Sequence, residues 1–336
     1  MRNSPARGIV LAAFALVATA CGDSPTTPAR PAPSSAPPGP SRLLPPGATL
    51  TIVSGYEGEP VAGAQVRLDG GEPPFRSDSA GRVVVVAGAA GDALLEVEAE
   101  GFLPRRTRVR SPEDVRVSLW PRDVRSLGVS EGYTRKLVYT AWDLPLGAPT
   151  QRMHRLAQGI ARVGVVPSAE LRAIPGVTAA LTGAAERMTA TTGIAFSVED
   201  TSTGDATIDV VLDPTYDCGN NRGCVVRQYR GVSIVGATIV FMHPGFVGLR
   251  RQGVLLHEMG HVLGLEHSLR DSDLMGLGLW QGLWDFTDAE RLAIRMLLHR
   301  KAGNEFPDDD ANVSPADANG VAAGSMREEV VVCDLP

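Results

Sequence analysis

The sequence predicts an α+β domain over residues 125–302, preceded by a small all-β sandwich over residues 48–120. Short β-rich runs, broken by Gly, Pro and Asp and without helical periodicity, fill the earlier region, as expected for an antiparallel sandwich. In the later region several strand patterns are followed by two late helices, an order typical of α+β domains. With 336 residues and 43% hydrophobic content, the chain is long enough for two domains with buried cores.

We expect an export signal at residues 1–21, where two arginines precede the apolar run GIVLAAFALVATA. That run is too short to span a bilayer comfortably. The small residues directly before Cys21 resemble the lipobox of bacterial lipoproteins, in which the cysteine is lipidated, although Ala18 stands where leucine is usual. This resemblance implies a membrane-anchored protein in the periplasm or on the cell surface. The alternative is an ordinary signal and a secreted protein.

Two segments are expected to lack a core of their own. Residues 22–47 are rich in Pro, Ser and Ala and cannot bury enough apolar surface to offset the entropy of ordering, so they predict an extended tether. Residues 303–336 are acidic and rich in turn formers, which predicts a flexible tail, although EEVVVCDL within it could dock as an edge strand.

The predicted export decides how the remaining cysteines are interpreted. In an oxidising compartment, Cys218 and Cys224 could close CGNNRGC as a small disulfide loop. Two free thiols are the alternative, because sequence alone does not fix the pairing. Cys333 would then be left over in the tail.

The runs EPVAGAQVRL, SDSAGRVVV and LLEVEAEGF occur in the order seen in carboxypeptidase-regulatory-like, transthyretin-like domains, which residues 48–120 therefore resemble. This resemblance implies a fold and no chemistry. The formal net charge of −6 argues against nucleic-acid binding, which usually needs a basic face.

Several elements are predicted within residues 125–302. KLVYTAWDL, IAFSVED, TIDVVLDP and SIVGATIVFMHPG each predict a strand. Residues 175–192 predict a helix with Gly193 at its exit, and a second helix is expected from about Arg250 to Leu263. A third should begin at Thr287, because TDAE has the spacing of a capping box.

Half of the six histidines lie in the segment LLHEMGHVLGLEHS. His257 and His261 are four residues apart on the predicted second helix, so both project from one face and can bind one zinc ion. Gly264 can adopt positive φ, end the helix and turn the chain back. The turn would let His267 approach the same metal as a third ligand.

This pattern predicts a hydrolytic site. Three neutral imidazoles would leave a fourth zinc position for water, whose pKa zinc lowers to about 7. Glu258, next to His257, could accept the proton of that water during attack on a peptide carbonyl and pass it to the departing amine.

HEMGHVLGLEH matches the signature of the metzincin zinc endopeptidases, and the segment resembles the matrixin family (matrix metalloproteases) most closely. That family has a serine after the third histidine and a Leu-Met turn beneath the zinc, which Ser268, Leu274 and Met275 match. The resemblance implies a metzincin-type catalytic domain. Gly276 departs from the usual Met-Tyr-Pro, so pocket specificity does not carry over.

In matrixins the strand before the zinc helix is an edge strand that pairs with extended substrate. The resemblance therefore implies substrate contacts along Gly236, Ala237, Thr238, Ile239 and on to Phe241, with a plain interior strand as the alternative. A calcium ion at Asp213, Asp217 and Asn220 is conceivable but fits no defined loop, and these residues are typical turn formers.

We therefore expect a membrane-tethered, monomeric endopeptidase with one zinc ion and a peptide or protein substrate. The alternative is a catalytically silent metal-binding module with the sandwich as its contact surface. The intact Glu258 argues against that alternative, because a silent module needs no carboxylate beside the zinc. Another metzincin branch would differ in its substrate pocket and share the mechanism.

Overall fold

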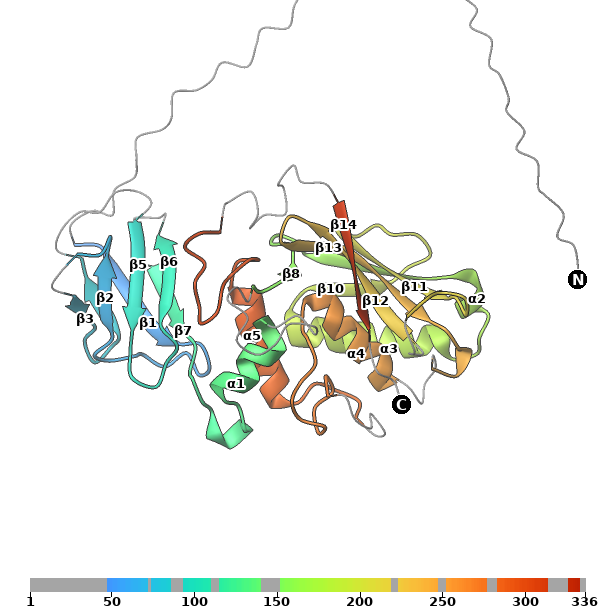
Figure 1. Ribbon diagram of the computed structural model, residues 1–336, viewed down its shortest axis with the longest axis horizontal. Helices are drawn as coiled ribbons and strands as arrows, with labels where there is room; N and C mark the ends of the chain where they lie inside the picture. The colour runs from blue at the N-terminus through green and yellow to red at the C-terminus, as the bar shows by residue number, and fades with distance from the viewer. Residues whose placement is uncertain are drawn as a thin grey trace, which may run out of the picture. The chain divides into compact units, whose positions relative to one another are not determined.

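The computed structural model describes residues 47–71, 74–85, 93–109, 115–139, 152–218, 223–246, 252–276, 283–313 and 326–332. Within these ranges the fold is mixed α+β, with three sheets and few helices (Figure 1). The predicted signal with Cys21, and the tether up to residue 46, lie outside the described residues. No helix in the described ranges is both long enough and apolar enough to cross a bilayer.

Two of the sheets form the sandwich and share one apolar core. The smaller has the strand order β4-β1-β7 and the larger β3-β2-β5-β6. Their bounds are β1 Thr49–Ser54, β2 Gln65–Leu68, β3 Phe75–Arg76, β4 Arg82–Val84, β5 Ala93–Glu98, β6 Arg105–Val109 and β7 Val115–Leu119. Leu50 and Ile52 of β1 and Leu95 of β5 are fully buried in the core between them. The expected all-antiparallel pairing is wrong at one place, because β1 and β7 run parallel.

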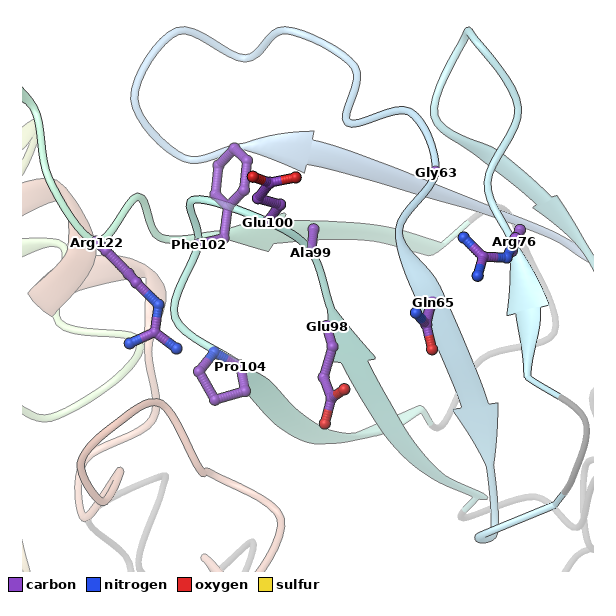
Figure 2. Close-up of a pocket in the computed structure, with 9 residues that line it drawn as sticks. All are labelled: Gly63, Gln65, Arg76, Glu98, Ala99, Glu100, Phe102, Pro104 and Arg122. Carbon is purple, nitrogen blue, oxygen red and sulfur yellow. The ribbon is translucent and has the colours of Figure 1, made fainter.

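A hollow of about 490 Å³ opens on the sandwich (Figure 2). Gln65 of β2 and Glu98 of β5 line it together with Phe102 and Arg122. None of the residues predicted to form the functional site lines this hollow.

The third sheet carries the strand order β10-β9-β11-β13-β12-β14, and the short β8 also pairs with β13. Its strands are β8 Arg155–Leu156, β9 Arg162–Pro167, β10 Ala195–Val198, β11 Ala206–Leu212, β12 Gly223–Arg230, β13 Ser233–Phe241 and β14 Met326–Val332. β10, β9, β11 and β13 are mutually parallel, whereas β12 is antiparallel to both of its neighbours. β13 therefore lies inside the sheet and β14 at its edge.

The long helices end and begin where the sequence predicts. α3 (Val177–Thr192) stops at Gly193, which has φ 74°, and α5 (Asp288–His299) starts at Thr287 with the expected capping box. α3 and α4 (Gln252–Leu263) lie side by side against one face of the third sheet (Figure 1). The short helical turns are η1 Arg125–Leu127, α1 Glu131–Thr134, η2 Arg135–Tyr139, α2 Ala169–Arg172 and η3 Pro244–Phe246.

The strand expected for KLVYTAWDL is wrong over its described part, because α1 and η2 make residues 131–139 helical. The cause is local. The Ser130 side chain accepts a hydrogen bond from the N–H of Tyr133 and so caps the first turn. Leu137, which looked like part of an alternating strand, is buried, and its carbonyl accepts from the N–H of Glu266.

Part of the expected flexible tail is packed instead. Asp308 and Asp310 are almost completely buried and form ion pairs with Arg105 of β6, and Arg300 also pairs with Asp308. Acidic composition predicted a solvated segment, but here the carboxylates neutralise buried guanidinium groups. Further on, EEVVVCDL contributes to β14, the edge strand that the sequence left open.

Candidate metal and catalytic site

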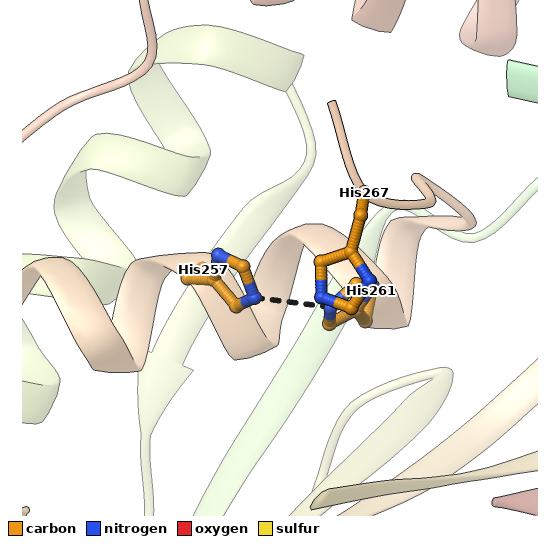
Figure 3. Close-up of side chains that lie close together, drawn as sticks. All are labelled: His257, His261 and His267. Carbon is orange, nitrogen blue, oxygen red and sulfur yellow. Dashed lines mark hydrogen bonds between the residues drawn. The ribbon is translucent and has the colours of Figure 1, made fainter. Parts of the chain in front are cut away.

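α4 places His257 and His261 on consecutive turns of one face, and both side chains are fully buried (Figure 3). His267 comes from the segment after the helix and faces them. One ring nitrogen from each of the three histidines lies within 4.8 Å of the others. Among the described residues, no other group of metal-ligating side chains comes together in this way.

The bend after α4 depends on Gly264, whose φ is 113°. A Cβ atom built on this residue would lie 1.9 Å from the carbonyl oxygen of His154. Two main-chain hydrogen bonds close the turn. The N–H of Gly264 donates to the carbonyl of His261, and the N–H of Leu265 donates to the carbonyl of Gly260. Only glycine fits both the backbone angle and the contact, so the predicted role of this residue has a steric basis.

Two main-chain carbonyls fix the protonation of the first two rings. Nδ1 of His257 lies 2.6 Å from the oxygen of Leu274, and Nδ1 of His261 lies 2.8 Å from the oxygen of Leu265. A carbonyl oxygen can only accept, so each Nδ1 must carry the hydrogen. In the neutral rings, each Nε2 then presents a lone pair.

Those two Nε2 atoms are 3.1 Å apart (Figure 3). Two lone pairs at that distance repel each other unless a cation lies beside both. Two nitrogens bound tetrahedrally to one zinc at about 2.0–2.1 Å would be about 3.3 Å apart. The donor set therefore fits a zinc ion in both chemistry and spacing.

Burial keeps the three imidazoles neutral. It lowers the pKa of His257 to about 4 and that of His261 well below its ordinary value. Burial, together with the positive potential of His257, lowers the pKa of His267 to about 2. At neutral pH all three rings are therefore in the form that binds a metal.

Met275 lies directly beneath this helix. A Cβ atom on Gly260, between the first two histidines, would come within 2.5 Å of the Met275 sulfur, so a larger residue there would displace the methionine side chain. The carbonyl of Met275 accepts from the N–H of Ser268, and its own N–H donates to Glu290 at 2.6 Å. The turn is thus bonded both to the residue after His267 and to the start of α5.

Sequence reasoning missed Asp273, which is fully buried and holds this turn together. Its carboxylate accepts hydrogen bonds from four side chains, namely Ser268 (2.5 Å), Tyr133 (2.8 Å), Arg270 (2.6 Å) and Thr287 (3.1 Å). Burial alone would raise the pKa of Asp273, but these donors and the charge of Arg270 outweigh it and lower the pKa. Two of the donors lie far away in the sequence, so no local pattern could have singled Asp273 out.

Sequence reasoning also missed Arg227 of β12. Its guanidinium donates to the carbonyls of His261 (2.7 Å) and Leu265 (2.8 Å) and to the carboxylate of Glu266 (2.8 Å). Burial by itself would lower the pKa of Arg227, but the Glu266 charge outweighs it and raises the pKa. The arginine therefore fixes the backbone between the second and third histidines, and an arginine in a strand carries no signal of this in the sequence.

Glu258, the predicted general base, is fully buried beside His257 on α4. The expected substrate strand is placed wrongly. Gly236–Ile239 lie in β13, which pairs with β11 on one side and β12 on the other and offers no free edge. The error arose because residues 223–230 were not recognised as a strand, and that strand, β12, lies between β13 and the edge strand β14.

The remaining predictions concern the segment between β11 and β12 and the end of the chain. A disulfide joins Cys218 and Cys224, with a Cα–Cα distance of 5.6 Å. Asp213 accepts from the N–H and hydroxyl of Thr215, as a turn-forming aspartate does. Asn220 and Cys333 lie outside the described residues, and the calcium site has no support in the described part of the loop.

No protein-family model matches the chain, and no curated protein matches it either. Among solved structures, the chain is similar to the crystal structure of metalloproteinase-II from Bacteroides fragilis. The two are 13% identical, and the match covers 74% of this chain and 84% of the other, with a TM-score of 0.28. The evidence for chemistry in this chain is the geometry of the three histidines.

Proposed function

We propose that the protein is a zinc-dependent endopeptidase. The observation that supports this most strongly is the convergence of three buried, neutral imidazoles, two of which present lone pairs 3.1 Å apart. Next to them in the chain is a carboxylate, that of Glu258, which is the residue type a hydrolase needs to move a proton.

Each residue has a distinct part in this proposal. His257, His261 and His267 would hold the zinc, and the carbonyls bonded to the first two would keep their rings oriented. When bound, zinc supplies a Lewis acid that polarises a carbonyl and acidifies water. Glu258 would accept a proton from the attacking water and return it to the leaving amine.

The finer assignment is a metzincin of matrixin type. Its support is the motif HEMGHVLGLEH together with Met275, which packs against the helix between the first two histidines. We further propose that the protein is exported and lipid-anchored at Cys21, on the basis of the lipobox-like segment.

Glu258→Gln tests the catalytic role directly. The variant keeps the side-chain volume and removes the base, so it should retain zinc while cleavage of a peptide library falls by about 10²-fold or more. Glu290→Gln is not a suitable control, because Glu290 supports the Met275 turn; exposed Glu170→Gln serves instead. A Glu258→Gln enzyme that cleaves at the rate of the unaltered chain would remove Glu258 from its role.

Complete burial of Glu258 favours a second candidate function. A catalytically silent metal-binding module needs no access of substrate to this carboxylate. Such a module would bind zinc in both the unaltered and the Glu258→Gln chain and would cleave no peptide in either. Chelator-sensitive cleavage by the unaltered chain excludes it.

A further inference from the structure

The outer edge of β12 is covered by a segment from the end of the chain. β14 (Met326–Val332) runs antiparallel to β12, in a continuous register from Arg230↔Met326 to Cys224↔Val332. Residues 314–325, between the packed segment after α5 and β14, lie outside the described residues. β14 thus adds to the sheet as a strand distant in sequence from the strand it pairs with (Figure 1).

The strand that forms this edge also carries Arg227, which bonds the segment between the second and third histidines. Arg227, at the middle of β12, pairs in register with Glu329 of β14. The same arginine donates to the carbonyl of His261 and to Glu266, which precedes His267. Neighbouring strands are about 4.8 Å apart, so a peptide on this edge would lie close to the strand that contacts the metal-binding segment.

β14 is held by a few side-chain contacts and by a main-chain ladder that any extended peptide could make. Of its side chains, Val331 is buried, Glu329 accepts from the hydroxyl of Tyr229, and the Arg327 guanidinium lies 4.5 Å from the centre of the same ring. Met326 and Val330 are 53% and 44% exposed. The rest of the attachment is the main-chain ladder, which does not depend on sequence.

We propose that residues 326–332 are an internal occupant of the outer edge of β12, which blocks the addition of an extended peptide to that edge and so restrains the enzyme. A peptide substrate would add to β12 as β14 does, with main-chain hydrogen bonds, after β14 is displaced. This proposal depends on the proposed peptidase function for its effect on activity. The binding site itself can be tested without any catalysis.

The test uses the full-length chain with β14 weakened in place. Consecutive residues of an antiparallel strand point their N–H groups in opposite directions, so the double variant Glu328→Pro with Glu329→Pro must remove one ladder hydrogen bond. Val330→Thr is the matched control, because it changes an exposed side chain and keeps every N–H group. Both variants leave the three histidines and Glu258 unaltered.

The first measurement is binding of a fluorescent, end-capped peptide of the sequence MREEVVV, followed by anisotropy. We expect the proline variant to bind it about tenfold or more tightly than the unaltered chain or the Val330→Thr chain. While β14 occupies the edge, the apparent affinity for a peptide is the intrinsic affinity multiplied by the fraction of molecules whose edge is free. Loss of β14 brings that fraction close to one, so the apparent affinity rises. Equal binding by all three chains, or binding by none, would overturn the proposal.

The second measurement is cleavage of a peptide library. The proline variant should show a higher kcat/KM than both other chains, and free MREEVVV should inhibit it competitively. Tighter peptide binding with an unchanged kcat/KM in an active enzyme overturns the restraining role. If no chain cleaves any peptide, the peptidase function has failed; tighter binding by the proline variant then still upholds the occupied peptide site, and equal binding overturns it.

Discussion

Two glycines of the histidine segment lie where neighbouring atoms leave little room for a side chain. Gly260 lets the Met275 turn approach α4, and Gly264 lets the chain turn back after it. At both positions a neighbouring atom occupies the space that a Cβ would need. At Gly264 the positive φ of 113° adds a second reason for glycine, whereas at Gly260 the reason is the packing of Met275 alone.

Gly264→Ala should destabilise the protein and weaken its zinc binding. The positive φ costs about 1–2 kcal/mol for a residue with a Cβ, and the 1.9 Å approach to the His154 carbonyl adds to that. For a domain of this size, the Tm should fall by about 2–4 °C per kcal/mol. Gly159→Ala is the control, since Gly159 has φ 87° and nothing within 4 Å of the built Cβ. Equal Tm values for the two variants would show that the contact with His154 is unimportant.

The sequence predicts the residues of the site whose relation is local. His257, His261 and His267 are brought together by helix periodicity and one turn, and both can be derived from the spacing. Arg227 and Asp273 could not be predicted, because the partners that define them come from other elements. Their roles follow from tertiary packing and carry no short-range pattern.

At the scale of elements, the segment after α5 bonds the sandwich to the α+β region, which the sequence predicts to be two separate domains. Asp308 accepts from Arg300 and from Arg105 of β6, at 2.8 and 3.1 Å, and all three side chains are almost fully buried. The Arg300 guanidinium also donates to Ser118 of β7. Because each guanidinium is buried, loss of the carboxylate would leave a charge without compensation.

Asp308→Asn should therefore lower the free energy of unfolding by about 3–5 kcal/mol at pH 7. Asp309→Asn is the matched control, because Asp309 pairs with Arg106, whose side chain is 43% exposed, and such pairs contribute about 0–1 kcal/mol. Denaturant unfolding of both variants measures the difference. Equal losses for the two variants would mean that the buried network contributes no more than a surface pair.

The ion pairs of Asp308 also predict how the free energy of unfolding depends on pH. Burial alone would raise the pKa of Asp308, but Arg300 and Arg105 outweigh it and lower the pKa below its ordinary value. A carboxyl with a depressed folded pKa contributes stability above its unfolded pKa of about 3.9 and loses it as the pH falls through the folded value. The difference between the unaltered chain and Asp308→Asn should thus persist down to about pH 4 and shrink below it. A difference that disappears between pH 7 and 5 would contradict this assignment.

Strand positions in the third sheet were predicted only in part. β10, β11 and β13 follow from their apolar patterns, but β12 contains the arginines of RQYR and its pattern is weak. Missing β12 made β13 look like an edge strand. The first helical turns at Glu131–Tyr139 were missed because a serine cap outweighed a β-rich composition.

At the scale of the whole molecule, the described sandwich is bonded to the α+β region at several points. Besides the Asp308 network, Arg295 of α5 donates to the carbonyl of Tyr56, just after β1. α5 therefore bonds both to the sandwich, through Arg295, and to the Met275 turn, through Glu290.

The proposed anchoring at Cys21 also concerns the whole molecule. Cys21→Ala should move the protein from the membrane fraction to the soluble fraction of the cells that export it, because the cysteine carries the proposed lipid. Cys218→Ala, which opens the small disulfide loop, should leave the distribution unchanged. An unaltered distribution of the Cys21→Ala chain would contradict lipid anchoring.

Zinc bound by three histidines is the claim on which the proposed function depends, and metal analysis of the purified full-length protein tests it most directly. The unaltered chain and His299→Ala, which changes an exposed histidine at the end of α5, should each contain a single zinc ion per chain. His267→Ala should contain much less, because one of the three donors is removed. Zinc absent from the unaltered chain, or undiminished in His267→Ala, would contradict the account.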